Sequence, residues 1–346
     1  MECGGVSMKA PGRLNGDGKV LTEALSELIR EETARIMEET ARYLKRTGAQ
    51  QALWSELLHQ SATESGTTRD SHESGVATRC RRLKRRIAFG WYGGKFNHLN
   101  WLLPLLPYTR HYCEPFGGSG AVLLNREPSP VETYNDIDGE VVNFFSALRD
   151  GAHELTRSIL LTPFSREEFA KACEYRADLP PLERARRFFV RARQVRTGLA
   201  QTASIGRWAN CKNTSRAGMA GAVSRWLGSI ESLPEIAARL LRVQIENRDA
   251  IEVIKLYDST DTLFYCDPPY LHGTRGDPKA YKYEMTEQQH ACLARELNSV
   301  NGKVAISGYP CPLMNELYEG WRRVEAPVKN CHSVKKPRME ALWINY

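Results

Sequence analysis

The chain has 346 residues, of which 42% are hydrophobic and 26% charged, and its formal net charge is +7. This length and balance are typical of a soluble globular protein that has a full hydrophobic core and two domains. No hydrophobic run approaches the roughly 20 residues that cross a bilayer, and the start of the sequence lacks the apolar segment of a secretory signal, so we expect a cytoplasmic protein. The nine cysteines include no CxxC pair and no cluster with histidine at zinc-binding spacing, which argues against a disulfide framework and a metal site.

Residues 1–80 are expected to form an N-terminal helical extension. Apolar residues recur at helical spacing in 21–45 and in 52–59, which predicts two amphipathic helices. Residues 61–78 are rich in Ser, Thr and Gly and are typical of a flexible linker. The basic run at 79–86 is compatible both with contacts to a nucleic-acid backbone and with an exposed linker, and the sequence does not decide between them.

A strand followed by a glycine-rich loop comes next. Residues 111–116 predict a strand that runs into Gly117-Gly118-Ser119-Gly120, and 121–125 are expected to begin a helix. Glycines let a backbone approach a ligand closely, so this order indicates a nucleotide-binding turn. The next predicted strand ends at Asp136, about 19 positions after Gly117, which is near the spacing where an acid binds ribose hydroxyls in such folds. Asp138 is the alternative.

Between about residues 150 and 240 the pattern changes from alternating strands and helices to helices alone. Helical spacing is found at 140–148, 154–161, 166–175, 182–193, 223–233 and 234–241. A predicted strand returns at 243–247, with Asp249 at its carboxyl end. We therefore predict three parts, namely the extension at 1–80, a catalytic domain made of 81–150 and 240–346, and an inserted domain at 151–239.

The insert contains a long basic window. No acidic residue lies between Glu183 and Glu231, whereas arginines and lysines recur there with Trp208 and Trp226 among them. Cations next to aromatic and small polar side chains neutralise phosphates and reach base edges, which favours nucleic-acid binding over a merely solvated basic face. The candidate DNA-binding residues are Arg191, Arg193, Arg196, Arg207, Lys212, Arg216 and Arg225.

Asp267-Pro268-Pro269-Tyr270 is the strongest candidate for the chemical site. It follows an apolar, aromatic run at 262–266 that predicts a buried strand, and the two prolines exclude both strand pairing and helix. The Asp267 carboxylate, the Pro268 carbonyl and the Tyr270 ring are then presented where open α/β sheets bind ligands, and we expect this corner to lie beside the glycine turn at one edge of a single sheet. Two acceptors and an aromatic face suit a planar ring that carries an amino group. A strand-to-loop turn with a solvated aspartate is the alternative.

The last third of the chain continues the alternating pattern. Residues 271–284 contain Gly, aromatic and charged residues and are expected to act as a lid. A capping box at 286–289 opens a predicted helix that ends at Leu297. A strand at 303–307, a helix at 313–318 and closing strands at 322–326 and 341–345 complete the predicted α/β sheet.

Taken in order, these segments resemble the α-group of N6-adenine DNA methyltransferases, the Dam-like family. The matching segments are WYGGK at 91–95, EPFGGSGAV at 114–122, NDID at 135–138, DPPY at 267–270, and 303–309. The likeness covers about residues 87 to 346. It implies a Rossmann-like S-adenosylmethionine-dependent methyltransferase sheet with an inserted, mostly helical target-recognition domain.

The resemblance also implies roles for individual residues. Asp267, Pro268 and Tyr270 would be catalytic and hold a flipped-out adenine. Asp249 would face the adenine of S-adenosylmethionine, although a plain helix N-cap is an equally good explanation, and Trp91 has a core position as its alternative. The implied cofactor-binding residues are Trp91, Lys95, Glu114, Pro115, Phe116, Gly117, Gly118, Gly120, Asp136, Asp249 and Asp267.

The implied activity is site-specific transfer of a methyl group from S-adenosylmethionine to N6 of adenine in double-stranded DNA, without metal, by a prophage or restriction-modification type of enzyme that associates with the nucleoid through DNA. Methylation of cytosine N4 or of RNA bases, and an inactive DNA-binding relative, are the alternatives. Residues 184–230 lack the sequence expected of a GATC reader, so the resemblance does not give the target site. It gives no oligomeric state either.

Overall fold

The computed structural model describes residues 85–196, 200–216, 218–275, 282–327 and 339–346. The predicted helices and linker of residues 1–80, most of the basic run at 79–86 and the middle of the predicted lid lie outside the described residues. The described residues belong to a single unit, 81–346. Within the described part of the chain, no helix combines the length and the hydrophobicity needed to cross a bilayer.

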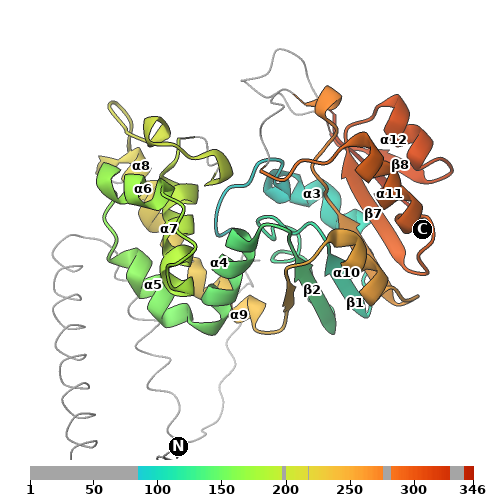
Figure 1. Cartoon of the computed structure of the whole chain (residues 1–346), viewed down its shortest axis with the longest axis horizontal. Helices are drawn as coiled ribbons and strands as arrows, with labels where there is room; N and C mark the ends of the chain where they lie inside the picture. Colours follow the sequence, from blue (N-terminus) through green and yellow to red (C-terminus); the bar gives the residue numbers. More distant parts are fainter. Residues whose placement is uncertain (1–84, 197–199, 217, 276–281, 328–338) are drawn as a thin grey trace, which may run out of the picture. The chain divides into compact units, whose positions relative to one another are not determined.

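A seven-stranded sheet forms the centre of this unit, in the order β5-β2-β1-β6-β7-β9-β8 (Figure 1). The first five strands in that order are parallel, while β9 runs antiparallel between β7 and β8. The strands are β1 (His111–Glu114), β2 (Val131–Asn135), β5 (Gln244–Glu246), β6 (Thr262–Cys266), β7 (Lys303–Gly308), β8 (Arg322–Glu325) and β9 (Ala341–Ile344). The predicted Rossmann-like α/β sheet is confirmed, since β2 and β6 flank β1 on opposite sides, and a crevice is expected at this switch point.

Alternate residues of the central strands point to two hydrophobic cores, as the period of a strand requires. Leu263 of β6 belongs to the core under α3 (Leu99–Leu102) and α4 (Gly139–Asp150), whereas Phe264 belongs to the opposite core. The opposite core is closed by α10 (Ala250–Tyr257), α11 (Glu287–Leu297) and α12 (Pro312–Leu317). Both faces of the central strands are therefore covered, which explains the nearly continuous apolar sequence of the fully buried strand β6.

The insert is helical, as predicted, and packs on α4 (Figure 1). Its α-helices are α5 (Ala152–Leu160), α6 (Arg166–Cys173), α7 (Pro181–Gln194), α8 (Gly221–Ile230) and α9 (Leu233–Leu240), joined by η3 (Ala200–Thr202), η4 (Ile205–Arg207) and a hairpin of β3 (Ser215–Arg216) and β4 (Met219–Ala220). Phe144 of α4 stacks on Phe189 of α7 at 5.6 Å between ring centroids, and Phe189 contacts Trp226 of α8.

A buried ion pair also joins the insert to the sheet. Arg239 of α9 donates from Nη2 to Oε1 of Glu132 on β2 at 2.7 Å, and both side chains are buried. The same hydrophobic core contains residues of the sheet, of α4 and of the insert. The insert and the sheet thus share one continuous interior instead of two separate ones.

The predicted helix at 121–125 is wrong, because this segment forms turns. Gly118 and Gly120 place the backbone in the left-handed region, with φ of 49° and 61°, so the chain does not enter a helix directly. The Asn125 side chain donates to the Ala121 carbonyl at 2.8 Å and pairs with the main chain of Arg86, competing with helical hydrogen bonds. Helix α10 and the β3–β4 hairpin were not predicted. The capping box of Thr286 and Gln289 is confirmed.

Candidate active site

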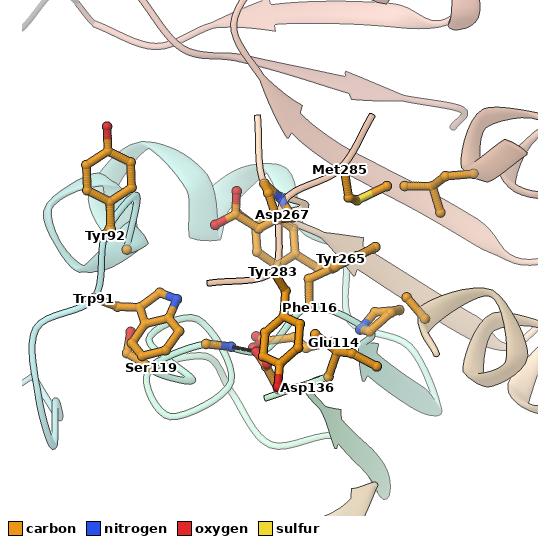
Figure 2. Close-up of a pocket in the computed structure, with 18 of the residues that line it drawn as sticks. Trp91, Tyr92, Glu114, Phe116, Ser119, Asp136, Tyr265, Asp267, Tyr283 and Met285 are labelled. Atoms are coloured by element: carbon orange, nitrogen blue, oxygen red, sulfur yellow. Dashed lines mark hydrogen bonds between the residues drawn. The ribbon is translucent and has the colours of Figure 1, made fainter. Parts of the chain in front are cut away.

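The glycine turn after β1 and the proline corner after β6 lie side by side. The two strands are parallel neighbours in register, His111 opposite Thr262, so their carboxyl ends meet at the same edge of the sheet. Both segments line one cavity of about 480 Å³. Figure 2 shows Glu114 and Asp136 on one side of it and Asp267 on the other. The predicted meeting of these two distant segments is confirmed.

The glycine turn is shaped by two aromatic rings. A Cβ atom on Gly117 would meet the Tyr134 ring at 2.2 Å, and one on Gly118 would meet the Trp91 ring at 2.7 Å. The Tyr134 hydroxyl donates to the Gly118 carbonyl at 2.6 Å. The turn therefore presses its bare backbone against Trp91 and Tyr134, an approach that only glycine permits.

Asp136 fixes the turn from the end of β2. Its Oδ2 accepts the Gly118 N–H and its Oδ1 accepts the Asp138 N–H, both at 2.8 Å. Burial raises the pKa of Asp136 to about 6, although these two N–H groups favour its charged form. Asp138 is instead the N-cap of α4 and accepts Gln201 Nε2 at 3.2 Å and Lys282 Nζ at 3.3 Å. Of the two candidate acids, Asp136 is the one that lines the cavity.

Glu114 is a buried acid on the cavity wall. Its Oε1 accepts the Tyr112 hydroxyl at 2.7 Å. Burial raises the pKa of Glu114 to about 8, and the Asp267 charge adds to the effect, against the opposing Tyr112 hydrogen bond. Glu114 is therefore mostly protonated at neutral pH and adds little charge to the site.

Asp267 is paired with Lys95, a residue far away in the sequence. Lys95 Nζ lies 2.7 Å from Asp267 Oδ2, donates to the Gly93 carbonyl at 2.6 Å, and lies 5.0 Å from the centre of the Tyr270 ring. Burial opposes the charge of Lys95, but Asp267 and Glu340 outweigh it and raise its pKa. Burial raises the pKa of Asp267 as well, while Lys95 lowers it. Lys95 and Asp267 thus form a buried ion pair that lines the cavity.

The corner itself is held by a histidine that the sequence did not single out. The Nε2 atom of His290 lies 2.9 Å from the Pro269 carbonyl, and His290 is buried on α11. Tyr270 is only 4% exposed and packs its ring edge-on against Tyr309 at 4.9 Å. It does not line the large cavity, so its ring is covered in this arrangement.

Most of the predicted site residues come together. The predicted residues that line the cavity are Trp91, Lys95, Glu114, Pro115, Phe116, Gly117, Gly118, Asp136, Asp249 and Asp267. Gly120, Pro268 and Tyr270 are neighbours of the cavity wall without lining it. Asp249 is also the N-cap of α10, accepting the Ile251 N–H at 2.8 Å, so the N-cap explanation is confirmed and its role toward the cofactor stays a prediction.

Several lining residues were missed. They come from the insert, from the loop after β5 and from the segment after the DPPY motif, namely Gln201, Arg248, Lys282, Tyr283, Gln289 and Cys292. Arg275 and Glu284, on either side of the residues left undescribed in the predicted lid, form an ion pair at 3.1 Å. The aromatic and charged composition of 282–284 was the local feature of the sequence that indicated a role for this segment at the cavity.

The basic window of the insert divides into two parts. The Arg191 side chain is 12% exposed, lies 3.2 Å from Glu140 and donates to the Ala172 carbonyl at 2.7 Å. Because its guanidinium is already bonded within the protein, we do not propose Arg191 as a DNA contact. Arg184, Arg186 and Arg187 are likewise paired with carboxylates. Among the described residues, no carboxylate lies within ion-pair distance of Arg193, Arg196, Lys212, Arg216 or Arg225.

Comparison with known proteins agrees with this geometry. The sequence is 26% identical over 268 residues to a DNA N-6-adenine-methyltransferase of Escherichia phage P1, which covers 71% of this chain and 33% of the relative. The chain thus spans about a third of the length of this curated relative.

Solved structures give a more distant likeness. An rRNA methyltransferase, aviRa, from Streptomyces viridochromogenes is similar over 71% of this chain and 81% of its own, with 14% identity and a TM-score of 0.33. A SAM-dependent methyltransferase from Agrobacterium tumefaciens is similar over 72% of this chain and 61% of its own, with 11% identity and a TM-score of 0.30. The fold assignment rests on the strand order of the sheet. Residues 91–338 match the family of D12 class N6 adenine-specific DNA methyltransferases, and the chain belongs to this family.

Proposed function

We propose that this chain transfers a methyl group from S-adenosylmethionine to N6 of an adenine in double-stranded DNA. The observation that carries the proposal is the meeting of the glycine turn and the Asp267 corner at one cavity. A volume of about 480 Å³ lies within the range of small-molecule sites, and its wall combines bare backbone, aromatic rings and a few carboxylates.

The glycine turn side of the cavity suits the cofactor. S-adenosylmethionine, when bound, supplies an electrophilic methyl group. Asp136 would accept the ribose hydroxyls, because an acid at the end of the second strand is placed for that bond. Trp91 would pack against the cofactor, and the backbone of Gly117 and Gly118 would allow it to approach without a side chain in the way.

The Asp267 side suits the target base. The amino nitrogen of adenine is a weak nucleophile because its lone pair is conjugated into the ring. Asp267 and the Pro268 carbonyl would accept its two N–H bonds and favour a tetrahedral nitrogen as positive charge develops, which stabilises the transition state more than the ground state. Holding the nitrogen in line with the methyl group lowers the barrier further.

An adenine inside a duplex cannot reach this buried edge of the sheet. We therefore propose that the base is flipped out, at a cost of a few kcal/mol for unstacking and unpairing. The candidate phosphate contacts are the predicted DNA-binding residues other than Arg191, namely Arg193, Arg196, Arg207, Lys212, Arg216 and Arg225. Arg193 and Arg225 are close neighbours, since burial and then Arg225 lower the pKa of Arg193 to about 10.

The test is incorporation of tritiated methyl groups into duplex DNA, followed by nucleoside analysis. Wild type is expected to produce N6-methyladenine, and Asp267→Ala to lose at least about 100-fold in rate, the scale expected when a transition-state hydrogen bond is removed. Asp178→Ala is the matched control, because Asp178 is exposed on the insert, does not line the cavity and pairs with Arg176 at 2.7 Å. Equal rates for wild type and Asp267→Ala would refute the site, and N4-methylcytosine as the product would refute the substrate.

A further inference from the structure

Lys95 lies between two carboxylates, and only one of them belongs to the proline corner. The second is Glu340, the residue before β9, whose Oε2 lies 3.8 Å from Lys95 Nζ. The exposed fractions of the three side chains are 3% for Lys95, 18% for Asp267 and 10% for Glu340. His98 Nδ1 lies 3.9 Å from the same Glu340 oxygen. Among the described residues, no group donates a hydrogen bond to Glu340 Oε2.

The charges of this cluster do not balance. Asp267 and Glu340 together carry two negative charges when ionised, against one positive charge on Lys95. The other titratable groups that face the cluster are His98, Glu114, Tyr265, Tyr270 and Tyr309. Burial keeps Tyr265 protonated and raises the pKa of Glu114 to about 8, so neither adds a further negative charge to the cluster at neutral pH. The cluster can therefore accept one proton.

The proposed reaction releases one proton. The N6–C bond forms as the S–C bond breaks, the sulfur keeps the electron pair of the broken bond, and N6 becomes positively charged until it loses a proton. We propose that Glu340 is a positioning residue that holds Lys95 against Asp267 and supplies the second negative charge that favours transfer of the N6 proton to Asp267. The proton passes to solvent when the methylated base leaves. This role rests on the proposed function.

The substitution Glu340→Gln removes the negative charge of the side chain and keeps nearly the same size and shape. The main-chain carbonyl of Glu340 accepts the Ala326 N–H at 2.8 Å, a bond between the ends of β9 and β8 that Glu340→Gln keeps. With Glu340 uncharged, Lys95 and Asp267 balance each other. Asp267 then binds a proton less tightly, because charges at this distance in a buried site interact strongly. The variant should titrate Asp267 at lower pH and accept the N6 proton less readily.

The first readout needs no activity. Carbon-13 NMR of carboxyl-labelled aspartate, with the Asp267 signal assigned by its loss in Asp267→Asn, measures the pKa of Asp267 in the full chain. Glu340→Gln is expected to lower it, and an unchanged value would overturn the role of Glu340. Glu325→Gln is the matched control, since Glu325 lies on the adjacent strand β8, opposite Ala341, and pairs with Arg323 at 3.0 Å.

The second readout is the pH profile of single-turnover methylation. Glu340→Gln is expected to move the acid limb to lower pH and to reduce the plateau rate by roughly tenfold, the scale of a weakened proton acceptor. Dissociation constants for DNA and S-adenosylmethionine should stay within about twofold of wild type. A wild-type profile, or a loss confined to cofactor affinity, would overturn the role. If the pKa of Asp267 moves but wild type methylates no adenine, the proposed function fails and the role fails with it.

Discussion

Gly118 shows how a single residue sets the geometry of the cavity. Its φ of 49° lies in the left-handed region, and its backbone N–H and carbonyl are both bonded, to Asp136 and Tyr134. The Trp91 ring occupies the place where a Cβ atom would project. Any side chain at this position must therefore displace Trp91 from the cavity wall or move the turn.

Gly118→Ala tests this close approach. Gly320 is the matched control, because its φ is 81° but nothing lies within 4 Å of its Cβ position. Both substitutions should cost about 1–2 kcal/mol of stability for the left-handed backbone. Only Gly118→Ala should weaken S-adenosylmethionine binding, by at least about tenfold, as measured by calorimetry. Equal affinity in both variants would show that the turn does not contact the cofactor.

Glu114 should make stability depend on pH. Its pKa is raised from 4.5 to about 8 in the folded protein, so between these values the folded state binds a proton that the unfolded state has lost. Stability from this group is present below pH 4.5 and is lost as the pH rises toward 8. Between pH 5 and 8, this group should lower the free energy of unfolding of the wild type by on the order of 2–4 kcal/mol, and Glu114→Gln should lack this decrease. Urea titration without cofactor measures both curves. Parallel pH curves for the two proteins would contradict this assignment.

At the scale of elements, α7 shows that basic residues in a sequence window without acids can still pair with acidic residues from elsewhere in the chain. Its arginines pair with Glu140 of α4, with Glu168 of α6 and with Glu183 in its own first turn. Among the described residues, the cations without such partners include Arg193 in the last turn of α7 and Arg225 on α8, and Lys212, just before the β3–β4 hairpin, and Arg216 on β3 are exposed. The part of the insert suited to phosphates is therefore its second half.

Replacing Lys212 and Arg216 by glutamine should weaken DNA binding and change its salt dependence. Each lost phosphate contact is expected to reduce the slope of log K against log salt by about 1, so the double variant should lose about 2 units of slope. Arg176→Gln is the control, because Arg176 is an exposed insert arginine that is paired with Asp178 at 2.7 Å. Fluorescence anisotropy at several salt concentrations gives the slope, and a slope equal to the control would contradict the role of the hairpin.

At the scale of the whole described unit, the sheet and the insert are joined by α4. One face of α4 belongs to the core that contains Leu263 of β6, and the same core includes Phe189 of α7 and Trp226 of α8. The buried ion pair of Arg239 and Glu132 also links the insert to the sheet. Separating the two side chains would leave buried charges without a partner, which is unfavourable. Opening the insert would therefore expose the interior of the sheet.

Phe144→Ala should test whether the two parts unfold together. Removing a buried ring from a packed core costs about 3–5 kcal/mol. Because Phe144 contacts Phe89 on the sheet side and Phe188 and Phe189 on the insert, we expect one calorimetric transition that includes both parts and moves to lower temperature. Phe144→Leu should show a smaller shift of the same transition. Two separate transitions, of which only one moves, would show that the insert is an independent domain.

The sequence by itself determined the strands of the seven-stranded sheet, most helices, the glycine turn and the proline corner, because each depends on contacts between residues close in the chain. The 262–266 strand is recognisable from its own apolar run, and the 286–289 cap from its own hydrogen bonds. It also predicted that two distant segments meet, since carboxyl ends of parallel strands share one edge.

Only the tertiary structure decided which charges face each other. Lys95, Asp267 and Glu340 are far apart in the chain, and no local pattern says that one ammonium serves two carboxylates. The same holds for His290 under the Pro269 carbonyl and for Arg191, whose charge is taken up by Glu140 of another helix. Electrostatic interactions depend on distance through space and on burial, and both are set by packing that brings together residues remote in sequence.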